Sequence, residues 1–109
     1  MTTAYKLKEF ISSPAKYTSL DLSGRISTDA DCLKLASLLK ENKSLKQLNL
    51  ACNKIGDRGA TAIANAFKEN KSLSQLDLDS NCIKDKGARA IADALKENMI
   101  LSQLNLSHN

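Results

Sequence analysis

Residues 43–70 read KSLKQLNLACNKIGDRGATAIANAFKEN, and residues 71–98 read KSLSQLDLDSNCIKDKGARAIADALKEN. The two stretches align without a gap, and 18 of their 28 positions are identical. Self-similarity at a fixed period of this length is typical of solenoid proteins, in which each repeat is one supersecondary unit. The pair therefore predicts a chain of stacked units, each of which buries its apolar side chains against its neighbours.

The same frame extends in both directions along the chain. Residues 99–109 repeat the opening of the unit, and residues 15–42 (AKYTSLDLSGRISTDADCLKLASLLKEN) are a more diverged copy. In that copy Arg25 stands where the later copies have an asparagine. We therefore expect one repeat region over 15–109, divided into 15–42, 43–70, 71–98 and a partial unit at 99–109.

The first 14 residues lie outside the repeat. Their large apolar residues follow a helical spacing that ends before Pro14: Tyr5, Leu7, Phe10 and Ile11. We interpret residues 1–14 as an N-terminal capping helix over the first repeat. A separate membrane-binding helix is the alternative interpretation.

Each unit begins with a strand pattern and continues with a helix pattern. Leu48 and Leu50 alternate with polar residues, as on a half-buried strand. A helical apolar stripe follows at Ala60, Ile63, Ala64 and Phe67 and recurs at Ala88, Ile91, Ala92 and Leu95. We expect both stripes to face inward, with the alanines allowing neighbouring helices to approach closely.

Polar residues mark the ends of the expected helices. Asp29, Asp57 and Asp85 come at the helix starts, where a carboxylate can accept hydrogen bonds from free N–H groups. Asn70 and Asn98 come at the helix ends, where we expect the left-handed conformation that asparagine tolerates.

The combined pattern, LxxLxLxxN followed by an Ala-rich helix, resembles the leucine-rich-repeat family. Its 28-residue length and GAxAIAxA helix are similar to the ribonuclease-inhibitor subfamily. The resemblance implies an α/β fold: a right-handed solenoid curved into a horseshoe arc, with a parallel sheet on the concave face and helices on the convex face. It also implies that the recurring asparagines, Asn53, Asn81 and Asn109, turn inward as a structural ladder.

The number and placement of the charged residues bear on whether the partner is a nucleic acid. The chain has 16 Lys and Arg against 12 Asp and Glu, a formal charge of +4. The basic residues alternate with acidic ones on the expected helices and turns, and no aromatic platform accompanies them, so no nucleic-acid partner is expected.

No secretory signal or membrane span is visible in the sequence. The three cysteines, an odd number without a CxxC pair, are expected as buried free thiols. Together these features predict a cytoplasmic protein.

No set of residues predicts catalysis, a metal site or a cofactor. The one histidine, His108, has no cysteine or carboxylate at metal-ligand spacing and is interpreted as a surface repeat residue. Asp77, Asp79 and Asn81 begin like a calcium loop. Cys82 and Ala88 then occupy the positions of the loop's glycine and final glutamate. We therefore expect a non-enzymatic protein.

The residues between the strand leucines are expected to point away from the core, onto the concave face where the family usually binds partners. This predicts a polar, mildly acidic binding surface at Asp21, Gln47, Asn49, Gln75, Asp77, Asp79, Gln103 and Asn105. The sequence thus predicts a protein-interaction module for a partner that offers amides or basic groups. By analogy of composition it could be a bacterial effector that acts in the host cytosol. The alternative is a structural piece of a longer array that self-associates through its uncapped C-terminal end.

Overall fold

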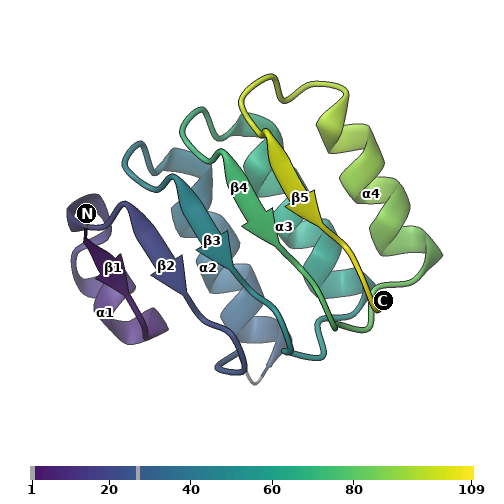
Figure 1. The fold of residues 1–109 in the computed structure, drawn as a ribbon, viewed down its shortest axis with the longest axis horizontal. Coiled ribbons are helices and arrows are strands. Elements are labelled where there is room, and N and C mark those ends of the chain that lie inside the picture. The colour runs from purple at the N-terminus through teal and green to yellow at the C-terminus, as the bar shows by residue number, and fades with distance from the viewer. Residues whose placement is uncertain (1, 27) are drawn as a thin grey trace.

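A computed structural model of the chain describes residues 2–26 and 28–109. The strands are β1 (Thr3–Ala4), β2 (Ser19–Asp21), β3 (Gln47–Asn49), β4 (Gln75–Asp77) and β5 (Gln103–Asn105). The helices are α1 (Leu7–Ser12), α2 (Asp29–Glu41), α3 (Asp57–Glu69) and α4 (Asp85–Leu95), with a short 3-10 helix, η1 (Pro14–Lys16). Figure 1 shows one sheet with α2 and α3 behind it and α4 beside β5.

The sheet is parallel throughout, and its strands follow one another in chain order from β1 to β5. Leu20, Leu48, Leu76 and Leu104 are direct partners across adjacent strands, so neighbouring strands are offset by one 28-residue repeat. Equivalent repeat positions therefore form columns across the sheet. The predicted α/β architecture, with a parallel sheet on one side and helices on the other, is confirmed.

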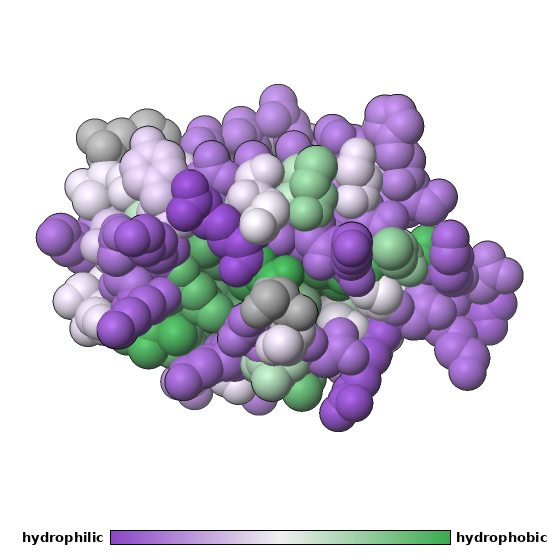
Figure 2. Space-filling view, turned by 90° about the horizontal axis from the view of Figure 1, so that it is seen from below, coloured by the Kyte–Doolittle hydropathy of each residue, from purple (hydrophilic) through white to green (hydrophobic). Residues whose placement is uncertain are grey.

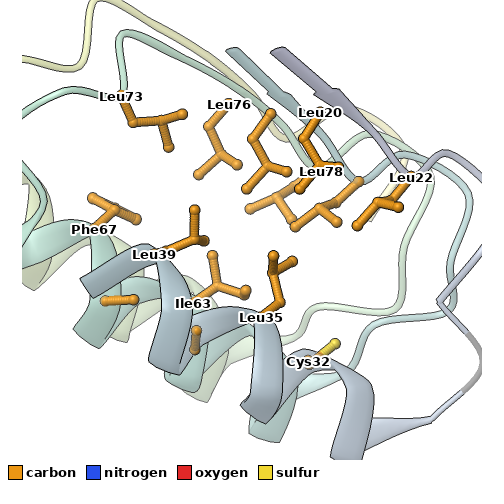
Figure 3. Packing of buried hydrophobic residues seen from close by; sticks show 14 of the residues in the cluster. Leu20, Leu22, Cys32, Leu35, Leu39, Ile63, Phe67, Leu73, Leu76 and Leu78 are labelled. Carbon is orange, nitrogen blue, oxygen red and sulfur yellow. The ribbon is translucent and has the colours of Figure 1, made fainter. Parts of the chain in front are cut away.

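The core lies between the sheet and the helices. Figure 3 shows strand leucines such as Leu76 and Leu78 pointing toward Ile63 and Phe67 on the helix layer. Leu22, Leu78, Ile63 and Phe67 are all 0% exposed. Full burial of such a side chain stabilises the fold by about 1.5–3 kcal/mol, so the repeated leucines account for much of the driving force.

The last helix departs from the predicted inward stripe. Ile91 is buried, but Ala88, Ala92 and Leu95 are exposed. Their equivalents on α3 (Ala60, Ala64 and Phe67) are buried because α4 covers them. The expectation was wrong for these three residues of α4, since this side of a repeat helix is covered by the next helix and not by the sheet.

The recurring motif asparagines bind backbone groups of neighbouring repeats. Asn81 Oδ1 accepts hydrogen bonds from the N–H groups of Asn53 and Ile55, both at 3.0 Å. Asn81 Nδ2 donates to the carbonyls of Leu50 and Leu78, again at 3.0 Å. Asn53 makes the same type of contact with the first repeat. Asn109, although exposed, donates to the Leu78 carbonyl and accepts from the N–H of Ile83.

A second asparagine column, which the sequence reading missed, lies at the other end of the repeats. Asn70 is 1% exposed and Nδ2 donates to the carbonyls of Leu39 and Asn42, while Oδ1 accepts from the N–H groups of Ser72 and Leu73. Asn42 and Asn98 make equivalent bonds. The left-handed conformation predicted for Asn70 is wrong: its φ is −73° and its ψ 132°, which is extended backbone.

The N-terminal segment contains a helix, but a shorter one than the spacing predicted. Residues Thr3–Ala4 form β1 instead and extend the sheet by pairing with β2. Helix α1 follows and buries Phe10, whose ring lies 6.4 Å from that of Tyr17. Tyr5 is 54% exposed. The division of the chain at residue 14 and the repeat limits remain predictions.

The cysteines are free, but only one is buried. Cys32 is 1% exposed, whereas Cys52 and Cys82 are exposed, so the expectation of three buried thiols was wrong for these two. Burial, together with the negative charges of Asp29 and Asp31, raises the pKa of the Cys32 thiol from 9.0 to about 11. Cys52 lies in a bend with φ of 60° and is exposed.

One helix-start aspartate, Asp57, acts across repeats. The N-cap residue of α3 is Gly56, and that of α4 is Lys84. Asp57 Oδ1 accepts hydrogen bonds from the N–H groups of Lys84 (2.7 Å) and Gly87 (3.0 Å), so it caps the following helix. The repeat that contains α3 thus helps to fix the start of α4.

Candidate protein-binding surface

The outward side chains of the sheet line one polar groove of about 580 Å³. Seven of the eight residues predicted for the concave face lie in its wall, in two columns that the strand register creates: Gln47, Gln75 and Gln103; and Asp21, Asn49, Asp77 and Asn105. Thr3 and Tyr5 extend the groove at its N-terminal end. Both residues were assigned to a capping helix, whereas Thr3 belongs to β1 and Tyr5 lies between β1 and α1.

The Asp/Asn column is held in place by its own backbone. In each member Oδ1 accepts a hydrogen bond from the N–H two residues later, at 3.1 Å for Asp21, 3.0 Å for Asn49, and 2.9 Å for Asp77 and Asn105. The second side-chain atom of each has no hydrogen-bond partner among residues 2–26 and 28–109. It is an oxygen in the aspartates and an amide nitrogen in the asparagines. The column therefore presents alternating acceptors and donors, about 4.8 Å apart, at fixed positions.

Asp79 lies outside this groove. Its Oδ1 is 2.8 Å from Nδ1 of His108, on the turn after β5, and the Asp79 side chain is 28% exposed. The sequence reading treated His108 as an isolated surface residue, but one repeat length brings it beside the carboxylate. Asp79 thus already has a side-chain partner within the chain, whereas the hydrogen bonds of Asp21 and Asp77 within residues 2–26 and 28–109 come from backbone N–H groups.

The glutamine column is more accessible and less constrained. Gln47 and Gln75 are half-buried, Gln103 is exposed, and none of the three side chains makes a hydrogen bond within the described residues. Amides can donate and accept, so this column can adapt to a partner's backbone or side chains.

The groove and the helix side carry different charges: the charged residues that line the groove are acidic, and the helix side carries both signs. No lysine or arginine lines the groove, although the chain carries a net charge of +4. On the helix side, Lys40 pairs with Glu69 at 3.5 Å, and Lys68 pairs with Glu97 at 2.9 Å. The bond to Glu97 raises the pKa of Lys68. Figure 2 shows hydrophilic residues over most of one side of the molecule, with hydrophobic ones mainly in a band between them. Lys40 and Lys68 are thus paired with carboxylates, whereas Asp21 and Asp77 form no salt bridge within residues 2–26 and 28–109.

Other kinds of site find little support in the described part of the chain. No group of three or more His, Cys, Asp or Glu side chains there could hold a metal ion. No helix within residues 2–26 and 28–109 is long and apolar enough to cross a membrane.

Comparison with known proteins identifies the repeat. The family model described as "Leucine Rich repeat" matches residues 41–64 and 69–92. No curated protein sequence matches the chain. Among solved structures, the leiomodin-1 actin-binding site 2 is similar, with a TM-score of 0.83 and 29% sequence identity over 94% of this chain. The similar region covers 61% of the leiomodin-1 chain, so this chain spans about three fifths of its length. The repeats at 41–64 and 69–92 are therefore leucine-rich repeats, and the chain has the fold of a leucine-rich-repeat solenoid.

Proposed function

We propose that this chain is a non-enzymatic protein-interaction module that binds its partner through the concave sheet face. The observation that carries the proposal is the Asp/Asn column. Its side chains are fixed in orientation, and each keeps one unpaired polar atom directed away from its own backbone bond. Preorganised groups lose little conformational freedom on binding, which favours affinity.

The charges of the groove favour a basic partner. Asp21 and Asp77 lie two strands apart, which places their carboxylates roughly 10 Å from each other. In a polyproline II segment, side chains three residues apart project from the same side at a spacing of about 9 Å. An extended partner segment with two arginines three residues apart could therefore place one guanidinium at each carboxylate. The asparagines and glutamines between would bind its backbone.

Two double variants with the same change in net charge test the proposal. Asp21→Asn with Asp77→Asn removes both groove charges but keeps the Oδ1 acceptors, as Asn49 and Asn105 already do at the same repeat position. Glu41→Gln with Asp93→Asn removes two exposed charges from the helix side.

Binding is measured by fluorescence titration of a proline-rich peptide with arginines three residues apart. A peptide of the same composition with adjacent arginines is the control ligand. We expect the groove variant to bind the first peptide about 2- to 30-fold more weakly, at about 0.2–1 kcal/mol per ion pair, and the helix-side variant to bind it like wild type. Equal loss in both variants would contradict a role for the concave face.

Actin is the first natural partner to test, because the similar structure is an actin-binding site of leiomodin-1. Co-sedimentation with filamentous actin and titration of labelled monomeric actin cover both of its forms. If actin binds here through the concave face, the groove variant should bind it more weakly than the helix-side variant. Unchanged binding in the groove variant would assign actin to another surface. No binding to either form would exclude actin as the partner.

The finer proposals of a ribonuclease-inhibitor-like subfamily, a cytoplasmic location and a role as a bacterial effector in the host cytosol rest on sequence resemblance and composition. A translocation reporter fused to the chain tests delivery. A signal in host cells that depends on the bacterial secretion apparatus would support it, and a signal absent from host cells would contradict it.

A further inference from the structure

An aromatic side chain lies beside one of the two groove carboxylates. Ala4 of β1 is the direct partner of Leu20 of β2, and the two strands are neighbours in the sheet (Figure 1). The next residues along the two segments are Tyr5 and Asp21, which therefore share one register position. Ala4 is 0% exposed and points into the core, so Tyr5 points to the concave face, where it lines the groove. Tyr5 thus precedes Asp21 in the Asp/Asn column, about 4.8 Å away.

The ring of Tyr5 is available to a partner. Its side chain is 54% exposed, and within residues 2–26 and 28–109 it makes no hydrogen bond and no contact with another ring or with a cation. Tyr17, in contrast, is buried and packs near Phe10. Exposed tyrosines of this kind are enriched in protein interfaces, because one side chain offers both apolar area and a polar group.

The second column of the groove leaves more space beside Tyr5 and Asp21 than elsewhere. On β3, β4 and β5 this column carries glutamines, but on β1 and β2 it carries the shorter Thr3 and Ser19. A long side chain of a partner can therefore reach Asp21 without displacing a glutamine. At Asp77 the same approach passes Gln75 of the same strand.

The guanidinium group of arginine suits this pair of groups. It is planar, so it can stack on an aromatic ring with one face while its edge donates hydrogen bonds to a carboxylate. The side chain of Tyr5 is longer than that of Asp21, so its ring reaches farther into the groove. A guanidinium stacked about 3.5–4 Å from the ring therefore lies above the carboxylate. Oδ1 of Asp21 already accepts from the N–H of Ser23 at 3.1 Å, and Oδ2 is left to receive the guanidinium.

We propose that Tyr5 and Asp21 together form a subsite for one arginine of the partner, with the guanidinium stacked on the ring and hydrogen-bonded to the carboxylate. This inference rests on the proposed binding of an extended basic segment by the concave face. Asp77 has no such ring, because its neighbours in the column are Asn49 and Asn105.

The two acidic positions of the groove therefore differ in specificity. A lysine ammonium is a compact charge without a flat face, so it gains less from Tyr5 than a guanidinium does. The Asp21 position selects arginine over lysine, while the Asp77 position distinguishes them less. Tyr5 is thus the residue that determines which cation the groove prefers.

Two peptides test this preference by fluorescence titration: the proline-rich peptide with arginines three residues apart, and the same peptide with lysine in place of both arginines. Wild type should bind the arginine peptide about 2- to 5-fold more tightly, as expected for a partly exposed contact between a cation and a ring. Tyr5→Leu should remove this preference, and Tyr5→Phe, which keeps the ring, should retain it. Circular dichroism should be unchanged in both variants, because the Tyr5 side chain is exposed.

A double-mutant cycle tests whether one guanidinium contacts both groups. The loss of affinity for the arginine peptide in Tyr5→Leu combined with Asp21→Asn should be smaller than the product of the two single losses, because both changes act on one contact. Asp77→Asn is the matched control. It lies three strands from Tyr5, about 14 Å, so its loss should multiply with that of Tyr5→Leu.

The outcomes separate this subsite from the proposed function on which it rests. Equal binding of the two peptides by wild type, a preference that survives Tyr5→Leu or is lost in Tyr5→Phe, or losses that multiply in both cycles would each overturn the arginine subsite. Binding through the concave face would still stand in these cases if Asp21→Asn with Asp77→Asn weakened the binding of both peptides. A wild type that binds neither peptide would overturn the proposed function and the subsite together.

Discussion

Truncating Asn70 should destabilise the solenoid more than any exposed change, because this side chain joins two repeats. It lies at the end of α3 and is 1% exposed. Asn70→Ala removes two donated and two accepted hydrogen bonds to backbone groups, which span from Leu39 to Leu73. The alanine offers these groups no replacement.

The cost follows from the number of groups left without a partner. A buried polar group that loses its hydrogen bond costs about 1–3 kcal/mol. The low end applies here because removal of the amide leaves space that a water molecule can occupy. The carbonyls of Leu39 and Asn42 each keep one hydrogen bond, from the Asn42 N–H and the Ser72 hydroxyl, both at 3.3 Å. The two N–H groups of Ser72 and Leu73 at about 1 kcal/mol each, with a smaller loss at the two carbonyls, give a loss of about 2–3 kcal/mol. The free energy of unfolding of a domain of this size is about 5–15 kcal/mol, so Asn70→Ala should remove a substantial part of it.

Urea denaturation followed by circular dichroism measures this loss directly. Asn65→Ala is the matched control: it removes the same amide from the same helix at an exposed position, and it should be neutral or slightly stabilising because alanine favours helix. A loss below about 1 kcal/mol for Asn70→Ala, or equal losses for the two variants, would refute the reasoning that the second asparagine column holds the repeats together.

Two further predictions concern close packing and titration. Gly87→Ala should lower the free energy of unfolding in urea by about 1–3 kcal/mol, because the new Cβ would lie 2.8 Å from Asp57 Oδ1. The control is Gly56→Ala, whose new Cβ would have its nearest contact at 4.0 Å and which should change the free energy of unfolding by less than about 1 kcal/mol. Equal effects of the two variants would contradict this prediction. The free energy of unfolding of the wild type should fall between pH 9 and pH 11 relative to that of Cys32→Ala. The reason is that the pKa of the Cys32 thiol is about 11 in the folded chain and 9.0 in the unfolded chain. Parallel pH profiles of the two proteins would contradict this prediction. Alanine already occupies this repeat position at Ala60, so Cys32→Ala should fold normally.

The fold could be predicted from the sequence because two repeats with nearly the same sequence must adopt the same structure. Two nearly identical units fix the strand register, and the register alone brings Asp21, Asn49, Asp77 and Asn105 into one column. Alternation with leucines then directs these side chains away from the core. A solenoid converts sequence period into spatial position, which is why seven groove residues could be named without a structure.

The errors arose where a residue's environment depends on its neighbours in space. The pattern of Ala88, Ala92 and Leu95 is that of a buried stripe, but its burial depends on a following helix. Asn70 was assigned a local backbone role, and its actual role is a set of bonds to the preceding repeat. Tyr5 fitted a short helical spacing, but the helix begins only at Leu7, and Thr3 and Ala4 before Tyr5 pair with β2. Each of these depends on a partner that the repeat alone does not specify.

Nuclear magnetic resonance of the ¹⁵N-labelled protein tests the central claim, that the concave face binds the partner. The side-chain amide signals of Gln47, Gln75, Gln103, Asn49 and Asn105 report on the groove directly, and backbone signals of α2, α3 and α4 report on the opposite side. On titration with the peptide whose arginines are three residues apart, we expect shifts confined to these amides and to β2 through β5. Shifts confined to the helices, with the groove amides unchanged at saturation, would contradict it.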